Sequence, residues 1–156
     1  MTTQTPQSQN KLLAENRKAR LNYELLENFE CGIVLVGSEV KSLRAGQLNF
    51  GSAYAWFKEG ELFLEGLEIS AYKQGSFFNH AVEHPRKLLL HRKEISRIAK
   101  KLSEKGLTLV PLKIYLKNSR VKVLIALAKG RTHHDKRDYI KEREGKRQIA
   151  RVLKRG

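Results

Sequence analysis

Histidine and acidic side chains that could carry acid–base or metal chemistry stand together at His133, His134 and Asp135. Adjacent histidines do not face one another on a helix, and neither HExxH nor a similar metal-binding frame surrounds them. Three further histidines flank a loop without matching acids or cysteines: His80, His84 and His91. The sequence has no P-loop, GxSxG motif or CxxC pair. We therefore predict no enzymatic activity, no metal and no cofactor, and interpret the adjacent histidines as solvated or base-stacking side chains.

The charge of the chain points to a polyanionic partner. Lys and Arg number 31 against 16 Asp and Glu, which gives a formal net charge of +15. RNA, DNA or an anionic membrane surface would each attract such a protein. The longest apolar runs, residues 33–36 and 107–112, are far shorter than the roughly 20 residues of a membrane-spanning helix, and residues 1–10 contain no apolar signal region. The single cysteine, Cys31, fits a reducing compartment, so we expect a cytoplasmic protein without a membrane partner.

Alternating apolar residues predict a domain that is mainly β structure. Residues 1–15 are polar and are expected to be disordered, while strand patterns begin at Leu21. The clearest hairpin spans residues 54–64 with its turn at Glu59-Gly60, and two long strands, 107–116 and 121–128, are joined at Asn118-Ser119. Pro111 lacks a backbone N–H, which predicts an edge strand or a bulge. Shorter strands are expected near residues 32–36 and from residue 67, with an irregular loop over residues 75–85.

Two helices are expected within this domain. Apolar residues at helical spacing predict a long helix over residues 92–105, closed by Gly106, and a short one over residues 40–45, closed by Gly46. Hairpins with inserted helices suggest an oligonucleotide-binding (OB-like) antiparallel β-barrel over residues 16–130. The cations of the long helix are interpreted as its solvated face: Arg92, Lys93, Arg97, Lys100 and Lys101.

Residues 131–156 form a basic C-terminal tail. Ten Lys or Arg oppose four Asp or Glu there, and few apolar side chains accompany them, so burial cannot offset the entropy of ordering the segment. Helix formers are present, and Ile149, Val152 and Leu153 share one helical face, although Gly145 weakens a helix by about 1 kcal/mol relative to Ala. We expect a tail that is disordered when free and becomes helical on a partner.

Aromatic residues divide into core and candidate binding positions. Four lie in expected strands and are assigned mainly to the core: Trp56, Phe57, Phe63 and Tyr115. Tyr23 follows Arg17, Lys18 and Arg20, where its ring could stack on an exposed base while the cations meet phosphates. Packing inside the fold is an equally good interpretation of Tyr23 from the sequence alone.

Several separated motifs together resemble one bacterial family. They are N-R-K-A-R at 16–20, G-S-E-V-K-S-L-R-A-G at 37–46, R-K-L-L-L-H at 86–91, G-L-T-L-V-P-L-K-I-Y at 106–115, A-K-G at 128–130, H-D-K-R at 134–137 and K-E-R-E at 141–144. From about residue 10 to the end, the sequence resembles the SmpB (small protein B) family of SsrA-binding, or tmRNA-binding, proteins. The resemblance implies an OB-like barrel that binds the tRNA-like domain of transfer-messenger RNA, one copy per RNA.

The resemblance also implies a role in trans-translation. Members deliver this RNA to 70S ribosomes stalled without a stop codon, and the nascent peptide is then tagged for degradation. EF-Tu and alanyl-tRNA synthetase act on the same complex, indirectly through the RNA. The tail is expected to become helical only on the ribosome, where it would probe the 16S decoding centre and the empty messenger channel.

Site residues follow from the matching motifs. The residues expected on or supporting the RNA surface are Asn16, Arg17, Arg20, Tyr23, Glu30, Leu89, Lys122, Lys129, Gly130 and Arg131. Those expected at the decoding centre or in the messenger channel are His134, Asp135, Lys136, Arg137, Lys141, Arg143, Lys146, Arg147, Ile149, Arg151, Val152 and Leu153. Thr132 and Gly145 depart from the family pattern, which has a second basic residue and a better helix former at these places.

Glu30 has two interpretations, because an acid on a cationic surface does not add affinity for RNA. It either accepts hydrogen bonds from RNA or orients a neighbouring cation, or it forms a structural salt bridge. Two other functions compete with the family role. An ordinary RNA-binding protein would have no reason to carry H-D-K-R, and a nuclease would need the adjacent histidines and Asp135.

Overall fold

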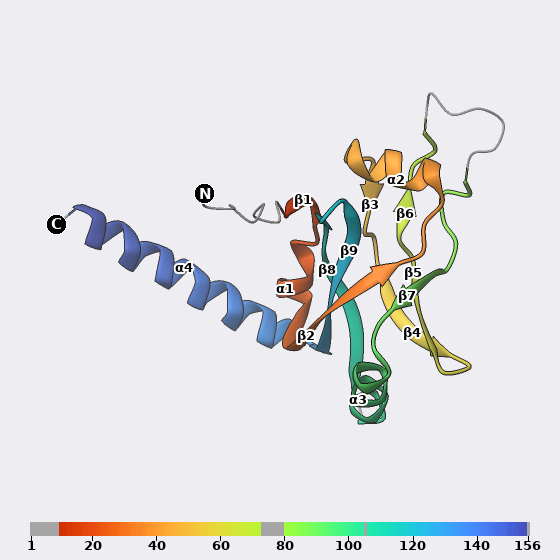
Figure 1. Cartoon of the computed structure of the whole chain (residues 1–156). Coiled ribbons are helices and arrows are strands. Elements are labelled where there is room, and N and C mark those ends of the chain that lie inside the picture. Colours follow the sequence, from red (N-terminus) through yellow and green to blue (C-terminus); the bar gives the residue numbers. More distant parts are fainter. Residues whose placement is uncertain (1–9, 73–79, 105, 156) are drawn as a thin grey trace, which may run out of the picture.

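The computed structural model describes residues 10–72, 80–104 and 106–155 (Figure 1). A barrel of short and long strands carries three helices, and a fourth helix extends away from it. The elements in chain order are β1 (Lys11–Glu15), α1 (Lys18–Asn22), β2 (Tyr23–Ile33), α2 (Gly37–Arg44), β3 (Leu48–Asn49), β4 (Tyr54–Lys58), β5 (Glu61–Glu65), β6 (Glu68–Ile69), β7 (Arg86–Leu89), α3 (Arg92–Leu102), β8 (Leu107–Lys117), β9 (Arg120–Gly130) and α4 (His133–Arg155).

A seven-stranded antiparallel sheet closes on itself because β8 is long enough to pair with three strands. The order is β1-β8-β4-β5-β7-β2-β9, and β8 also pairs with β9, so the ring is complete. β3 and β6 form a separate two-stranded sheet. The predicted small antiparallel barrel is therefore confirmed, with β1 added along the second half of β8.

The β8–β9 hairpin has the predicted turn and a predicted bulge. Lys117 lies opposite Arg120, and Asn118 and Ser119 between them both have positive φ angles, 51° and 64°. This backbone twist matches that of the paired strands. The register shifts between Pro111 and Lys113, which confirms the bulge, whereas the edge-strand alternative is wrong because β8 is paired on both sides. The 54–64 hairpin is also confirmed as β4 and β5.

The main core fills the barrel. Its buried side chains come from most strands, and Leu62, Leu109, Ile125 and Leu127 are fully buried. Cys31 belongs to this core, where burial raises the pKa of its thiol to about 12. α3 contacts β8 and β9 and inserts Ile98 into the core; it ends at Leu102, and Lys105 of the predicted helix lies outside the described residues.

A second, smaller apolar cluster lies on the outer face of the β8–β9 hairpin. Val110, Leu112, Ala126 and Ala128 line it, and Ala19 of α1 covers it. Figure 1 shows α1 lying beside these strands. α1 was not predicted, because in five residues it buries a single side chain and leaves no periodic pattern. α1 packs on the apolar outer side of β9.

The expected disorder of residues 1–15 does not extend to Lys11–Glu15, which form β1. Residues 1–9 lie outside the described residues. The physical reason for β1 is backbone pairing with β8, together with packing of Leu13 and Ala14 against the main core. The backbone N–H of Asn16 then donates to the Leu112 carbonyl at 2.7 Å, and its Nδ2 donates to the Pro111 carbonyl at 2.9 Å.

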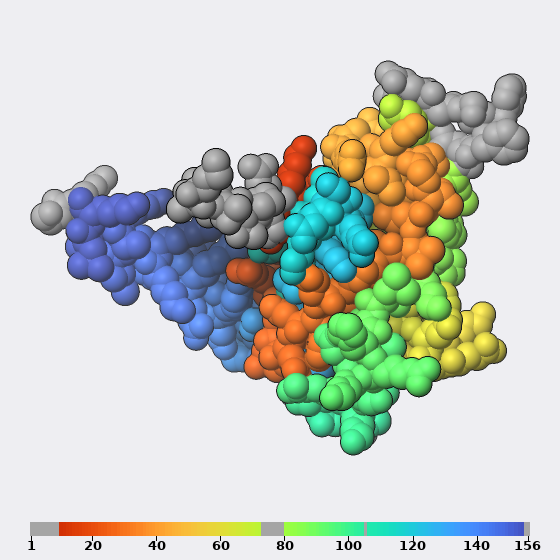
Figure 2. All heavy atoms as spheres, viewed as in Figure 1, coloured from red at the N-terminus to blue at the C-terminus, as the bar shows by residue number. Residues whose placement is uncertain are grey.

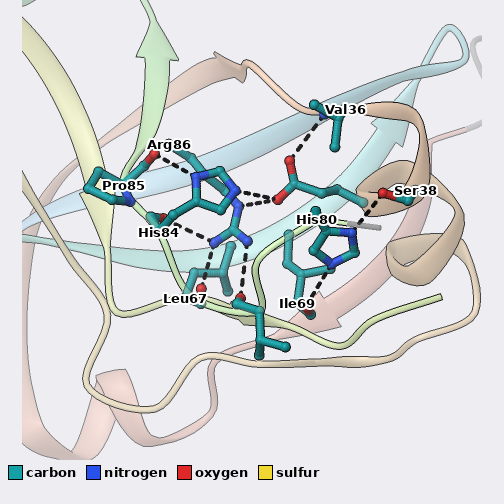
Figure 3. A network of polar contacts seen from close by, with 10 residues as sticks. Val36, Ser38, Leu67, Ile69, His80, His84, Pro85 and Arg86 are labelled. Carbon is teal, nitrogen blue, oxygen red and sulfur yellow. Dashed lines mark hydrogen bonds and ion pairs between the residues drawn. The ribbon is translucent and has the colours of Figure 1, made fainter. Parts of the chain in front are cut away.

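A buried ion pair joins α2 to β7 (Figure 3). Arg86 Nε donates to Glu39 Oε2 at 2.5 Å, and the guanidinium also donates to the Leu67 carbonyl at 2.6 Å and the Val82 carbonyl at 3.2 Å. His84 Nε2 lies 3.0 Å from the same carboxylate oxygen. His80 contacts Ser38 Oγ and the Ile69 carbonyl, both at 2.8 Å. The sequence motifs at 37–46 and 86–91 thus meet inside the protein.

In the tail, His133–Arg155 form the continuous helix α4. The expectation that this segment is disordered away from the ribosome stays a prediction. The start of α4 has a reciprocal cap that was missed in the sequence. The Asp135 N–H donates to Thr132 Oγ1 and the Thr132 N–H to Asp135 Oδ2, both at 3.2 Å. The Arg131 guanidinium also lies 4.4 Å from the centre of the Tyr139 ring. Stabilisation of α4 by the ribosome stays a prediction.

Candidate nucleic-acid interface

Four strands align one row of residues across the outer face of the barrel. Leu89 on β7 lies opposite Gly32 on β2, Gly32 opposite Lys122 on β9, and Lys122 opposite Tyr115 on β8. Residues opposite each other in antiparallel strands point to the same face. A Cβ at Gly32 would lie 3.2 Å from Leu89 Cβ, so the glycine lets the Leu89 side chain approach β2. The structure thus brings together Leu89 and Lys122, which are 33 positions apart in the sequence.

Glu30 lies on the same face as this row and has two partners. The Tyr115 hydroxyl donates to Glu30 Oε2, and Lys117 Nζ donates to Oε1 at 3.1 Å. The hydrogen bond from Tyr115 is the main reason that the pKa of the Glu30 carboxyl is lowered, and the charges of Lys117 and Lys122 add to it. The structure therefore contains the salt bridge that the sequence left as one of two interpretations of Glu30.

The other expected RNA residues meet at the opposite end of the β2–β9 pair. Tyr23 lies opposite Gly130, and the Arg131 N–H donates to the Asn22 carbonyl at 2.9 Å. Burial of Ala19 leaves Arg20 exposed on α1, and Arg17, immediately before α1, is exposed as well. Tyr23 packs partly against the second apolar cluster. Lys129 is exposed opposite Glu24. The expected RNA residues around α1 and Tyr23 thus lie on the same face of the barrel as Glu30, Lys122 and Leu89, and a hollow lined by Arg20, Lys113 and Leu124 lies between the two groups. We call this face, from α1 to β7, the outer strip. Lys129 lies at its edge, because strand alternation turns its side chain to the opposite side of β9 from Lys122.

The second set of expected site residues lies on α4. Figure 2 shows this helix projecting from the barrel, and it contacts α1 near its base. His134 Nε2 lies 3.3 Å from Asp138 Oδ2, and the cap from Thr132 lowers the pKa of Asp135. Lys136 is half-buried. The remaining members are exposed: Arg137, Lys141, Arg143, Lys146, Arg147, Ile149, Arg151, Val152 and Leu153.

Gly145 lies in the middle of α4 with no heavy atom within 4 Å of an added Cβ. Gly145→Ala should therefore stabilise the helix by about 1 kcal/mol without a clash. Circular dichroism of the full chain should show more helix and less fraying on heating. Ala150→Gly, at an exposed position of the same helix, is the matched control and should have the opposite effect. Equal spectra for all three proteins would contradict a marginally stable α4.

Several aromatic residues lie closer to the surface than the sequence predicted. Tyr115 was assigned to the core, but it is half-buried and its hydroxyl meets Glu30 on the outer face. Trp56 and Phe63 are also half-buried and contact each other on β4 and β5, with ring centroids 6.5 Å apart, whereas Phe57 packs against the core as expected. The strand register relative to Ile114, which is fully buried, is the signal that could have placed Tyr115 outside.

Two findings bear on other classes of site. Within residues 10–72, 80–104 and 106–155, no three His, Cys, Asp or Glu side chains gather as metal ligands would. No helix in the described part of the chain combines the length and apolar character needed to cross a membrane.

A closed β-barrel with a cationic outer strip and a basic helical arm is an architecture typical of nucleic-acid-binding proteins. The SmpB protein family model matches residues 13–155, and this chain belongs to that family. The SsrA-binding protein of Desulforudis audaxviator is 51% identical over 144 residues, covering 92% of this chain and 94% of that protein. The SsrA-binding protein of Symbiobacterium thermophilum is 54% identical over 143 residues, covering 91% and 90% respectively.

A solved structure agrees with the fold. It is described as "tmRNA-SmpB: a journey to the center of the bacterial ribosome" and is 48% identical in sequence. The match has a TM-score of 0.66 and covers 81% of this chain and 93% of that one. The expected family and the mainly β fold are thus confirmed.

Proposed function

We propose that this protein binds the tRNA-like domain of transfer-messenger RNA with the outer strip and brings that RNA to stalled ribosomes. The observation that carries the proposal is spatial. Residues assigned one by one from separate motifs, including Arg20, Tyr23, Glu30, Leu89 and Lys122, fall on one face of the barrel. Family membership and relatives named SsrA-binding protein support the identity of the RNA.

The binding mechanism needs shape and charge and no bond-making step. The closed barrel is a rigid OB-like support whose contour can fit a folded RNA, which is how structured RNA is commonly recognised. Lys122, Lys129 and Arg20 would neutralise phosphates and release counterions, so the affinity should fall steeply with salt. Leu89 would pack on a base or ribose rather than add charge.

α4 would act on the ribosome and not on the RNA domain. A helix of 23 residues is roughly 34 Å long at 1.5 Å per residue, a sensible length for entering a vacant messenger channel. Its base would place His134, Asp135, Lys136 and Arg137 at the 16S decoding centre, and its exposed cations would face ribosomal RNA. EF-Tu and alanyl-tRNA synthetase would act through the RNA, in the cytoplasm.

Binding of the isolated tRNA-like domain tests the proposal. The full chain should bind it at least tenfold more tightly than a hairpin duplex of equal length, and Lys122→Ala should weaken binding roughly tenfold. Lys87→Ala is the matched control, because that lysine pairs with Glu61 at 3.0 Å on the β5 side. If the chain binds the tRNA-like domain and the hairpin duplex with equal affinity, and Lys122→Ala and Lys87→Ala weaken binding equally, the protein is a general RNA-binding protein instead.

RNA cleavage provides a separate test of the nuclease alternative. Labelled RNA should stay intact with the full chain, with or without a divalent metal ion. Cleavage that disappears in His134→Ala would overturn the proposal.

A further inference from the structure

Both carboxylate oxygens of Glu30 already accept a hydrogen bond from within the protein. Tyr115 donates to one oxygen and Lys117 to the other. The geometry is that of an acid that holds neighbouring side chains in place.

The side chains that Glu30 holds belong to a cationic group on the outer face of the β8–β9 hairpin. Lys117 lies opposite Arg120, and Tyr115 lies opposite Lys122. Lys113 follows on the same face of β8. Glu30, on β2, contacts Tyr115 and Lys117 of this group, and it lowers the mutual repulsion of Lys117 and Lys122, both of whose charges act on it.

We propose that Lys117 is a further RNA-contacting residue, which binds the phosphate backbone, and that Glu30 and Tyr115 are positioning residues that hold it toward the RNA. This inference rests on the proposed function and extends the outer strip to the end of the β8–β9 hairpin. A lysine side chain has many rotamers, so fixing it before binding removes part of the entropy cost of the contact. Tyr115 fixes the Glu30 carboxylate, which in turn fixes the Lys117 ammonium group.

A purely structural role for the Glu30–Lys117 pair is the competing explanation. The Glu30 and Lys117 side chains are 37% and 39% exposed, and pairs this accessible contribute little to folding stability. The stability of Glu30→Ala should therefore be close to that of the parent chain. Its effect on RNA binding should be larger than its effect on unfolding.

The test is a double-mutant cycle on binding of the isolated tRNA-like RNA domain across a salt series. Lys117→Gln should weaken binding roughly fivefold and reduce the salt slope by about 1, the amount expected for one phosphate contact. Glu30→Ala should weaken binding to a similar degree, and adding Lys117→Gln to it should cost less than about twofold more. Tyr115→Phe should weaken binding in the parent and have no further effect in Glu30→Ala.

Lys87→Gln is the control, because Lys87 also pairs with one glutamate at 3.0 Å and its side chain is 40% exposed. It should change neither affinity nor slope. An unchanged salt slope in Lys117→Gln would overturn the inference. So would a full fivefold loss of RNA affinity from Lys117→Gln both in the parent chain and in Glu30→Ala. If the parent chain itself fails to prefer the tRNA-like domain, the proposed function fails instead.

Discussion

A chain that ends at Gly130, which also lacks the expected RNA residue Arg131, should still bind the tRNA-like domain within about tenfold of the full chain but support no peptide tagging. The barrel explains the retained binding, because β9 ends at Gly130 and the ring of strands is complete without α4. The loss of tagging follows from removal of the helix that would enter the ribosome. Filter binding and a reconstituted stalled-ribosome tagging reaction measure the two activities separately.

The truncation also removes ten cations and four acids, so its salt slope should be shallower than that of the full chain. A matched full-length variant avoids this change in length and most of the change in charge. Asp135→Asn with Lys136→Gln and Arg137→Gln should retain RNA binding and lose at least tenfold in tagging. A folded truncation that loses both activities together would contradict this division between barrel and tail.

Glu39→Gln is expected to lower the free energy of unfolding by about 3 kcal/mol at pH 7, because it leaves the Arg86 guanidinium buried without its counter-charge. Both side chains are almost fully buried, and their hydrogen bonds join α2, β7 and the Leu67 carbonyl. Urea unfolding of the full chain measures the loss. Glu61→Gln, which removes an exposed partner of Lys87, is the control and should cost less than about 1 kcal/mol.

The same pair should make stability depend on pH in the acid range. Burial raises the pKa of the Glu39 carboxyl, but hydrogen bonds from the Val36 N–H and Arg86, with the Arg86 charge, outweigh it, so the pKa is lowered from 4.5. A carboxyl with a depressed pKa in the folded state contributes stability above its unfolded pKa, and this is lost as the pH falls through the folded pKa. The difference between parent and Glu39→Gln should therefore shrink below about pH 4. A difference that stays constant to pH 2 would contradict an ionised Glu39.

The sequence predicted those parts of the fold that depend on residues close together in the chain. The β8–β9 hairpin, the turn at Glu59-Gly60 and α2 all follow from residues adjacent in the sequence. β1 and α1 were not predicted because the contacts that stabilise them lie on β8, about 95 positions away, where Asn16 donates to the Pro111 carbonyl. Glu39 and Arg86, 47 positions apart, form an ion pair that no spacing rule indicates.

The candidate site shows the same division. Motif resemblance supplied Glu30, Leu89 and Lys122 without a reason for their grouping, and strand register supplies that reason. The places of Tyr115 and Lys117 in the site were not predicted, because a tyrosine in a strand fits a core equally well. A single lysine in a basic sequence does not indicate a binding site. The contacts of both residues with Glu30 exist only after β2 and β8 are placed on either side of β9.

Sequencing the RNA bound to the intact chain purified from cells tests the central claim most directly. The outer strip should select one folded RNA, so transfer-messenger RNA should dominate the bound pool and should decline in Lys122→Ala while remaining in the chain that ends at Gly130. A pool made of ribosomal RNA fragments or of many unrelated transcripts, unchanged by Lys122→Ala, would contradict recognition of a single RNA by the barrel.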